Sequence, residues 1–526
     1  MKIKKNYAQE APERDFLYEG LPCLYEDGNY LLFSPYSLSF AIIKQRELFD
    51  PTVKRCLKRL NFFGNPFKPR NFSRICKLVF ILTNDCNLLC HYCYMFGGEG
   101  KRLDMPLEMA IRALNLSVSN HRVDQLRISF FGGEPTMAFD KIQKIVRLAK
   151  GLGVNLAFHI STNGITNKKI LDYLVQEKFL IGVSMDGPPY LNDLHRPRLD
   201  GSSSSGKVES TIKYLAKKGA RFLIRATVSS LNVNKMTESL EYWASLGAKY
   251  IHFEPVNMSG RASTGYIQPP DADDYINNFK KVLDKAEELN VYIISSPFMN
   301  LLTPSVYYCS PSGGETLLFT PDGAISKCYE IQTCNYNHSF FIVGEYDHRT
   351  KSFSFDDERC QFLRKFIVQN YTECRECYAK YLCGGGCPLR NYIATGTHFK
   401  VDPYSCKIRK ELIREAILRL RRSTQTNRIS PVLGINAYEN FLSWCFNNNT
   451  RNKGETKLNI GGEMKKTRNK GNIHRKGNCK ELSKDQKKAI ALLNKKGVSI
   501  MTFPLPDEIK DKKKIFRIKD RCESVF

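Results

Sequence analysis

The sequence lacks the long apolar runs of a membrane protein. No stretch of the 526-residue chain approaches the twenty or so consecutive apolar residues that a membrane-spanning helix needs. Its opening residues, Met1 to Asn6, are polar and contain no apolar core of a secretory signal. We therefore expect no membrane span and a cytoplasmic location, in which the 18 cysteines are reduced and tight cysteine clusters bind metal.

Acidic residues are also few. There are 53 Asp and Glu against 80 Lys and Arg, which gives a net charge of +27. Such a balance can indicate nucleic-acid binding. Part of the excess, however, lies in residues 451–480, and we interpret the charge as a solvated basic surface that could attract an acidic protein or peptide. Nucleic acid is not the expected partner.

Residues 75–304 alternate between short apolar runs and helical patterns, which predicts βα units around a parallel sheet. Six such units fit an α/β fold of the partial (β/α)6 TIM-barrel type, in which chemistry is expected at the carboxyl ends of the strands. The predicted strands are Lys77–Leu82, Leu126–Phe131, Leu156–Ile160, Leu180–Ser184, Phe222–Val228 and Tyr250–Glu254.

The segments on either side of this core differ from it. Residues 1–74 are predicted to form a cap or a peptide-recognition domain, with a strand at Tyr30–Phe33 and a helical pattern from Ile42 to Leu60. If this domain binds a peptide, the predicted strand would offer a free edge for backbone pairing. A structural cap on the open barrel is an equally good interpretation.

The C-terminal side divides in two. Residues 305–422 are rich in cysteine and end in a basic amphipathic helix, Lys407–Arg422. Residues 423–526 form a basic extension, in which residues 447–481 have the composition of a disordered segment. A short helix with Ser483 as its N-cap follows.

Three cysteines directly after the first predicted strand are the most informative motif. Cys86, Cys90 and Cys93 are separated by three residues and then by two. Three thiolates at this spacing can hold three corners of a 4Fe-4S cluster and leave the fourth iron open to a small molecule. A zinc knuckle is the alternative.

The other predicted strands also end in polar or glycine-rich motifs. Gly132, Gly133, Glu134 and Pro135 follow the second strand, Ser161 and Asn163 end the third, Ser184 ends the fourth, and Arg225 lies inside the fifth. A charge within an apolar strand is costly unless it is paired. Arg225 is therefore either a ligand-binding residue or the partner of a buried carboxylate such as Asp186 or Glu254.

These motifs together resemble the radical S-adenosylmethionine (radical SAM) superfamily. The resemblance implies that the cluster held by Cys86, Cys90 and Cys93 reduces S-adenosylmethionine to give a 5′-deoxyadenosyl radical, which takes a hydrogen atom from the substrate. By the same resemblance, the cofactor would be bound by Tyr92, Gly132, Gly133, Glu134, Pro135, Ser161, Asn163, Ser184 and Arg225, with Arg196 as a lesser candidate.

Seven further cysteines resemble the SPASM domain of peptide-modifying radical SAM enzymes, which holds two auxiliary 4Fe-4S clusters. The resemblance assigns one cluster to Cys374, Cys377, Cys383 and Cys406, and the other to Cys309, Cys328 and Cys387. Cys334 could supply a fourth ligand to the second set. Otherwise that iron is open, and a substrate thiolate could bind it. The alternative is a zinc ribbon.

The family resemblance leaves several functions open. We favour a maturase that forms a thioether crosslink in a ribosomally synthesised precursor peptide, with reduced flavodoxin or ferredoxin as electron donor. The first alternative is an anaerobic sulfatase-maturating enzyme, which makes formylglycine. That family typically carries an aspartate directly after the cysteine that corresponds to Cys328, whereas this chain has Tyr329. The non-enzymatic alternative is a zinc- and nucleic-acid-binding protein.

Overall fold

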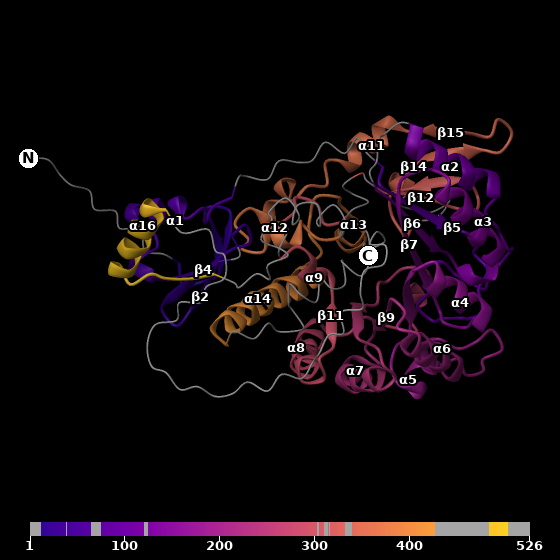
Figure 1. Cartoon of the computed structure of the whole chain (residues 1–526), viewed down its shortest axis with the longest axis horizontal. Coiled ribbons are helices and arrows are strands. Elements are labelled where there is room, and N and C mark those ends of the chain that lie inside the picture. The colour runs from indigo at the N-terminus through magenta and orange to yellow at the C-terminus, as the bar shows by residue number, and fades with distance from the viewer. Residues whose placement is uncertain are drawn as a thin grey trace, which may run out of the picture.

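The computed structural model describes residues 12–37, 39–64, 75–119, 125–301, 304–309, 314, 316–331, 339–426 and 483–502. A small sheet unit lies at one end of the molecule and a large sheet with its outer helices at the other (Figure 1). Helices α12 Lys380–Cys383, α13 Pro388–Thr395 and α14 Pro403–Thr426 of the cysteine-rich segment lie between them.

The large sheet has eleven strands in the order β11-β10-β9-β8-β7-β6-β5-β12-β13-β14-β15. The strands from β11 to β12 in this order pair in parallel, and β13 to β15 add an antiparallel edge. Strands β5 to β10 are the six predicted from the sequence, and the sheet is open, as a partial barrel requires. The bounds are β5 Lys77–Ile81, β6 Gln125–Phe131, β7 Asn155–Thr162, β8 Leu180–Ser184, β9 Phe222–Val228, β10 Tyr250–Pro255, β11 Tyr292–Ile294, β12 Thr316–Phe319, β13 Ala324–Ser326, β14 Ile342–Asp347 and β15 Ser352–Phe355.

The two faces of this sheet differ in polarity, because successive side chains of a strand point to opposite faces. On β6, Leu126, Ile128 and Phe130 belong to the main apolar core, whereas Arg127 and Ser129 alternate with them on the inner face. The crossover helices cover the apolar outer face. They are α2 Leu107–Ser119, α3 Phe139–Lys150, α4 Lys168–Gln176, α5 Pro189–His195, α6 Ser205–Lys217, α7 Met236–Ser245 and α8 Ala272–Leu289.

The cysteine-rich segment continues the large sheet. Strand β12 pairs in parallel with β5, so the sheet crosses the boundary that the sequence predicts at residues 304 and 305. The final helix, predicted at Lys407–Arg422, spans Pro403–Thr426 and packs against α8. The helices of this segment are α11 Asp357–Leu363, α12 Lys380–Cys383, α13 Pro388–Thr395 and α14 Pro403–Thr426, and α9 Ser296–Met299 precedes it.

The small sheet is antiparallel, in the order β1-β2-β3-β4-β16. Its last strand comes from the C-terminal extension, since Ser499–Thr502 pairs with Ser39–Ile42 of β4. The elements of this unit are β1 Phe16–Tyr18, β2 Leu21–Glu26, β3 Asn29–Ser34, β4 Ser39–Lys44, α1 Pro51–Arg59, α16 Lys484–Lys495 and β16 Ser499–Thr502.

Two expectations for this unit are wrong. The predicted strand at Tyr30–Phe33 is β3, but it lies between β2 and β4 and has no free edge for a peptide. The helical pattern predicted from Ile42 begins only at Pro51, because Phe40, Ala41 and Ile43 enter strand β4. Residues 447–481, predicted to be disordered, lie outside the described residues.

The predicted helix after Ser483 is α16, and Ser483 forms a capping box with Gln486. Leu493 and Val498 enter the apolar core of the small sheet beside α1. Lys496 donates to Asp50, the N-cap of α1, at 2.6 Å, and this contact lowers the pKa of Asp50 to about 2. The C-terminal segment therefore completes a domain that the N-terminal residues begin.

We expect Leu493→Ala to destabilise this domain by about 2–5 kcal/mol, because the fully buried side chain leaves a cavity. Its neighbour Leu492 is 41% exposed, and Leu492→Ala is the matched control, with an expected cost within about 0.5 kcal/mol. Hydrogen exchange of the β4 amides reports the domain's stability. Equal exchange rates in both variants would show that α16 is not part of the domain's core.

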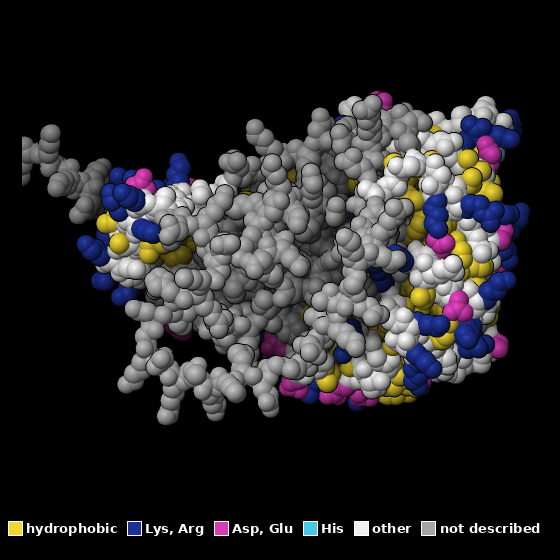
Figure 2. All heavy atoms as spheres, viewed as in Figure 1, with side chains coloured by type: hydrophobic (Ala, Val, Ile, Leu, Met, Phe, Trp, Pro, Cys, Tyr) yellow, Lys and Arg dark blue, Asp and Glu magenta, His cyan; other side chains and the backbone are white. Residues whose placement is uncertain are grey.

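Lys and Arg side chains are scattered over the outer helices and over the small sheet unit in the visible face (Figure 2). Acidic side chains lie among them, and no continuous basic stripe crosses the described part of this face. Among the described helices, none combines the length and apolar character needed to cross a membrane.

Candidate active site

The cysteine loop follows β5 at the carboxyl edge of the parallel sheet. Cys86 and Cys90 are buried and Cys93 is half-buried. The segment that follows α5 holds the loop by backbone pairing. The Leu89 amide donates to the Pro197 carbonyl at 2.8 Å, and the His91 amide to that of His195 at 3.0 Å.

The three thiols influence one another. Burial, the Glu134 carboxylate and the other two thiols raise the pKa of Cys86 to about 12. Burial raises the pKa of Cys90 to about 11, although the nearby Arg196 and Arg261 cations oppose the rise. Such thiols are neutral on their own and ionise on binding a metal, whose charge replaces the missing solvation.

The donor set consists of three cysteine thiols, and cysteine thiolates are the usual ligands of iron–sulfur clusters. A zinc site draws its ligands around one centre at about 2.0–2.3 Å. A cluster instead binds each thiolate to a different iron, so its ligands lie together without sharing one centre.

Gly132 and Gly133 are required because two loops touch. A Cβ on Gly132 would lie 2.4 Å from the carbonyl oxygen of Thr83, and one on Gly133 would lie 2.1 Å from that of Asp85. The Gly133 amide donates to Thr83 at 2.9 Å, and the Glu134 amide donates to Asp85 at 2.8 Å. The glycines thus fix the β6 loop against the cysteine loop.

The side chain of Glu134 is used inside the protein. Its fully buried carboxylate accepts from the Thr136 amide at 3.0 Å, the Thr162 hydroxyl at 2.9 Å and the Asn163 amide at 2.7 Å. Burial raises the pKa of Glu134, while these donors oppose the rise. The Glu134 side chain therefore joins the ends of β6 and β7, and Pro135 starts the next turn. A ligand bound at the Gly132–Pro135 motif would meet mainly its backbone.

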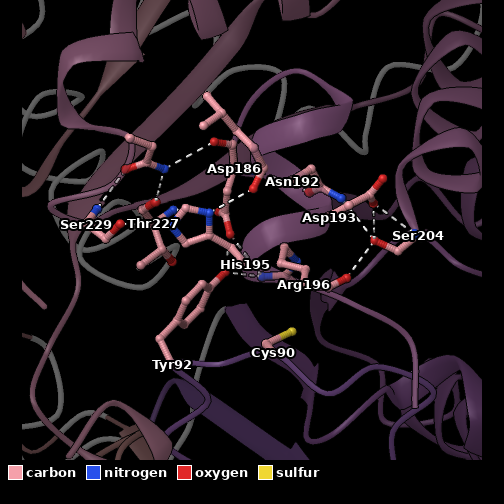
Figure 3. Close-up of polar contacts among 12 residues, drawn as sticks. Cys90, Tyr92, Asp186, Asn192, Asp193, His195, Arg196, Ser204, Thr227 and Ser229 are labelled. Atoms are coloured by element: carbon pink, nitrogen blue, oxygen red, sulfur yellow. Dashed lines mark hydrogen bonds and ion pairs between the residues drawn. The ribbon is translucent and has the colours of Figure 1, made fainter. Parts of the chain in front are cut away.

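Tyr92 belongs to a buried polar cluster (Figure 3). Its hydroxyl donates to Asp186 Oδ2 at 2.5 Å and accepts from Arg196 Nη1. Asp186 Oδ1 accepts from the Thr227 amide at 2.8 Å, and Arg196 lies 3.9 Å from Asp186. Arg196 also faces the Cys90 thiol, so the lesser candidate of the sequence analysis lies beside the cysteine loop.

The remaining predicted residues lie on β7, β8 and β9. Asn163 donates to Asn87 Oδ1 at 2.6 Å and lies 3.6 Å from Cys86 Sγ, so it contacts the cysteine loop directly. Ser184 and Arg225 are register partners at the centre of the sheet. Arg225 donates to Ser161 Oγ at 3.2 Å, and no ion pair joins it to Asp186, Glu254 or any other described carboxylate.

Arg261, which the sequence analysis did not identify, clamps the cysteine loop from the segment after β10. Its guanidinium donates to the carbonyls of Cys90 and Gly97, and Nε lies 3.0 Å from Glu99. A Cβ on the preceding Gly260 would lie 2.3 Å from Tyr94 Cα. No local motif marks Gly260 and Arg261, because the two carbonyls that Arg261 binds lie 171 and 164 residues earlier in the chain.

The downstream cysteines form two groups. Burial, followed by the thiols of Cys383, Cys377 and Cys406, raises the pKa of Cys374. Cys374, Cys377 and Cys406 line a cavity of about 640 Å³. The structure thus brings together the set that the sequence analysis assigns to one auxiliary cluster.

The second group contains Cys309, Cys328 and Cys387. Burial, the Glu330 carboxylate and then the other two thiols raise the pKa of Cys328. The ring of Tyr329, the residue after Cys328, lies 5.7 Å from that of Phe131 on β6. Cys334, the suggested fourth ligand, lies outside the described residues.

A family model described as the Radical SAM superfamily matches residues 80–242. The match spans β5 to α7 and includes the cysteine loop, the β6 loop and the Tyr92–Asp186–Arg196 cluster. Residues 80–242 therefore carry a radical SAM domain.

Several known proteins resemble the chain over longer ranges. A Methanocaldococcus jannaschii protein, MJ0907, is 29% identical over 261 residues, which cover 48% of this chain and 85% of that protein. A cysteine-type anaerobic sulfatase-maturating enzyme of Clostridium perfringens is 23% identical over 365 residues, or 64% of this chain and 95% of the relative. The solved structure of anSMEcpe with bound AdoMet shares the fold, with a TM-score of 0.54 and 21% identity over 66% of this chain and 95% of that one.

The chain is therefore a radical SAM enzyme, and the residues present fit the iron–sulfur group that this implies. Three adjoining thiols follow β5, two cations lie near them, and a glycine-rich loop backs them. The comparisons also show that the α/β fold is that of radical SAM/SPASM structures.

Proposed function

We propose that this radical SAM enzyme forms a thioether crosslink in a ribosomally synthesised peptide. The single observation that carries the proposal is the group of Cys309, Cys328 and Cys387, whose thiols lie close together beside Tyr329 and number three among the described residues. A cluster held by three cysteines has room for a thiolate from the substrate.

The proposal assigns three 4Fe-4S clusters. Cys86, Cys90 and Cys93 hold the one that binds S-adenosylmethionine. Cys374, Cys377, Cys383 and Cys406 hold a second, and Cys309, Cys328 and Cys387 a third. Bound there, these groups supply one-electron chemistry: cleavage of the sulfonium, and acceptance of the electron released when the carbon–sulfur bond closes.

The protein's own residues orient the reactants. Arg261 and the residues after α5 fix the cysteine loop from behind, and Gly132 and Gly133 fix it from the side. Tyr92, Ser161, Asn163, Ser184 and the backbone of Glu134 and Pro135 line the adjoining space, where we place the cofactor. The substrate loses one hydrogen atom from carbon, which the 5′-deoxyadenosyl radical would take, and one proton from sulfur, which would pass to solvent as the thiolate forms. The hydrogen-abstraction step itself needs no polar side chain as base.

Reduced flavodoxin or ferredoxin is the proposed electron donor, and the cytoplasm the proposed location. A precursor peptide is the proposed substrate. A second solved structure that is similar to this chain is native anSMEcpe with bound AdoMet and Cp18Cys peptide, at 21% identity and a TM-score of 0.53. A fold of this kind can therefore bind a peptide, which supports a peptide substrate here.

The test is mass spectrometry of a Cys-containing peptide encoded beside this gene, incubated anaerobically with enzyme, S-adenosylmethionine and reductant. A thioether product loses two hydrogen atoms, keeps its sulfur and no longer reacts with alkylating reagents. An unchanged peptide, with 5′-deoxyadenosine still formed, would reject this substrate and the crosslinking function for it.

Formylglycine formation is a second candidate, supported by the similarity to sulfatase-maturating relatives. Tyr329 stands where that family typically has an aspartate, but Glu330 follows it. This carboxylate accepts hydrogen bonds from Asn257 and, at 3.2 Å, from Ser259. In the same assay formylglycine would appear as a product that has lost its sulfur, and Glu330→Gln would slow its formation if Glu330 is the base.

A further inference from the structure

The inner face of the large sheet carries an unusual concentration of positive charge. Lys77 on β5 and Arg127 on β6 are register partners and are only 2% and 6% exposed. Arg225 lies on β9, within the electrostatic range of Lys77. Burial and the neighbouring Arg127 and Arg225 cations lower the pKa of Lys77 well below its usual range, so the guanidinium groups of Arg127 and Arg225 carry the positive charge of this face.

The side chain of Arg225 extends from β9 across the neighbouring strands β8 and β7. Its Cδ would be 3.1 Å from a Cβ at Gly182, so glycine on β8 makes room for the side chain. Beyond Gly182 the guanidinium reaches Ser161 on β7 at 3.2 Å. Two neighbouring strands therefore direct this cation to the middle of the inner face.

The groups around Arg225 are cationic or phenolic. Lys77 lies 5.4 Å above the ring of Tyr329, and Arg225 and Arg127 both face the Tyr329 hydroxyl. Burial and then Lys77 and Arg225 lower the pKa of His159 on β7, so this imidazole is neutral. The charged group beside the Arg225 guanidinium is therefore Arg127, because His159 is neutral and burial disfavours the charged form of Lys77.

The carboxylates of this region have other partners. Glu254 lies 3.5 Å from His252 and is in the field of Arg390 and Arg409. Asp186 is bound by Tyr92, Arg196 and the Thr227 amide. Glu330 accepts from Asn257 and Ser259. None of these three carboxylates forms an ion pair with Arg225.

We propose that the carboxylate of a substrate residue binds to Arg225 on this inner face, beside Ser161 and Tyr329 and within the field of Arg127. The proposal rests on the peptide-modifying function above and narrows its substrate to peptides with an Asp or Glu near the reacting cysteine. This assignment of Arg225 to the substrate replaces the contact with S-adenosylmethionine that the sequence analysis expected for it. The cations that lie near the Cys90 thiol are Arg196 and Arg261 instead.

The test measures selection among peptides without reductant, so no turnover is needed. Three pools of short N-acetylated, Cys-containing peptides serve as probes. The first pool contains Asp and Glu and has an amidated C-terminus, and the second contains Asn and Gln in their place and is also amidated. The third pool has the Asn and Gln sequences with a free C-terminal carboxylate. Reconstituted full-length enzyme with S-adenosylmethionine is mixed with each pool, and retained peptides are identified by mass spectrometry after anaerobic ultrafiltration.

We expect the enzyme to retain acidic peptides about tenfold better than their amides, the effect of one charge-assisted hydrogen-bonded contact. Arg225→Met should bring this ratio close to one, while Arg225→Lys should keep much of it. Arg147→Met, which removes an exposed arginine from α3, is the matched control and should leave the ratio unchanged. Selection of the free C-terminus pool instead would identify a terminal carboxylate as the ligand and overturn the Asp or Glu assignment.

Three results would overturn the proposal: no acid preference in the unaltered enzyme, an unchanged preference in Arg225→Met, or an equal loss of S-adenosylmethionine affinity in that variant. If Arg225→Met does not fold, Ser161→Ala is the deciding variant. It keeps the Arg225 charge but removes the hydrogen bond that orients the guanidinium, and it should reduce the retention of acidic peptides over their amides partially. Failure of the unaltered enzyme to cleave S-adenosylmethionine under reductant would refute the proposed function, whatever the peptide ratio.

Discussion

Changing Cys86, Cys90 and Cys93 together to Ala should abolish reductive cleavage of S-adenosylmethionine. The three thiols are the only cysteines on the loop after β5, and a cluster that loses all of them has no protein ligand there. 5′-Deoxyadenosine measured by chromatography should fall to the level of an enzyme-free control. Continued formation would show that the radical chemistry is located elsewhere.

The downstream clusters should survive in this triple variant, because their cysteines lie on other segments of the chain. If each of three sites holds four irons, iron should fall from about twelve to about eight per chain. Cys360→Ala is the matched control, since Cys360 is half-buried and belongs to none of the three groups. It should change neither iron nor activity. Stoichiometric zinc without acid-labile sulfide would contradict all three cluster assignments.

Gly133→Ala should have the next largest effect. The new Cβ would lie 2.1 Å from the Asp85 carbonyl oxygen and 2.6 Å from that of Asn84, and neither backbone atom can move without displacing the cysteine loop. We expect loss of iron from the first site and loss of most 5′-deoxyadenosine formation, measured by iron analysis and chromatography.

Gly206→Ala is the control for this change. Gly206 lies in α6, its Cβ would meet no atom within 4 Å, and alanine favours the helix. This variant should keep iron and activity and be slightly more stable. If Gly133→Ala behaved in the same way, the close approach of the two loops would not be needed for the site.

The sequence by itself determined the core architecture. The apolar runs that alternate with helical patterns became β5 to β10, because a strand covered on its outer face by helices must present apolar residues to them. The cysteine loop and the Gly132–Pro135 motif could be located in the same way, since the carboxyl ends of parallel strands meet at one edge. Ser483 was predictable as an N-cap because its capping box is local.

Only the tertiary structure decided what these residues contact. It turned Glu134 inward to join β6 and β7, and it brought Arg261 to carbonyls about 165 residues earlier in the chain. It also paired β16 with β4 across more than 450 residues, so that residues from both ends of the chain build one domain. These contacts follow from packing between distant segments, whereas local periodicity reports only which face of a segment is buried.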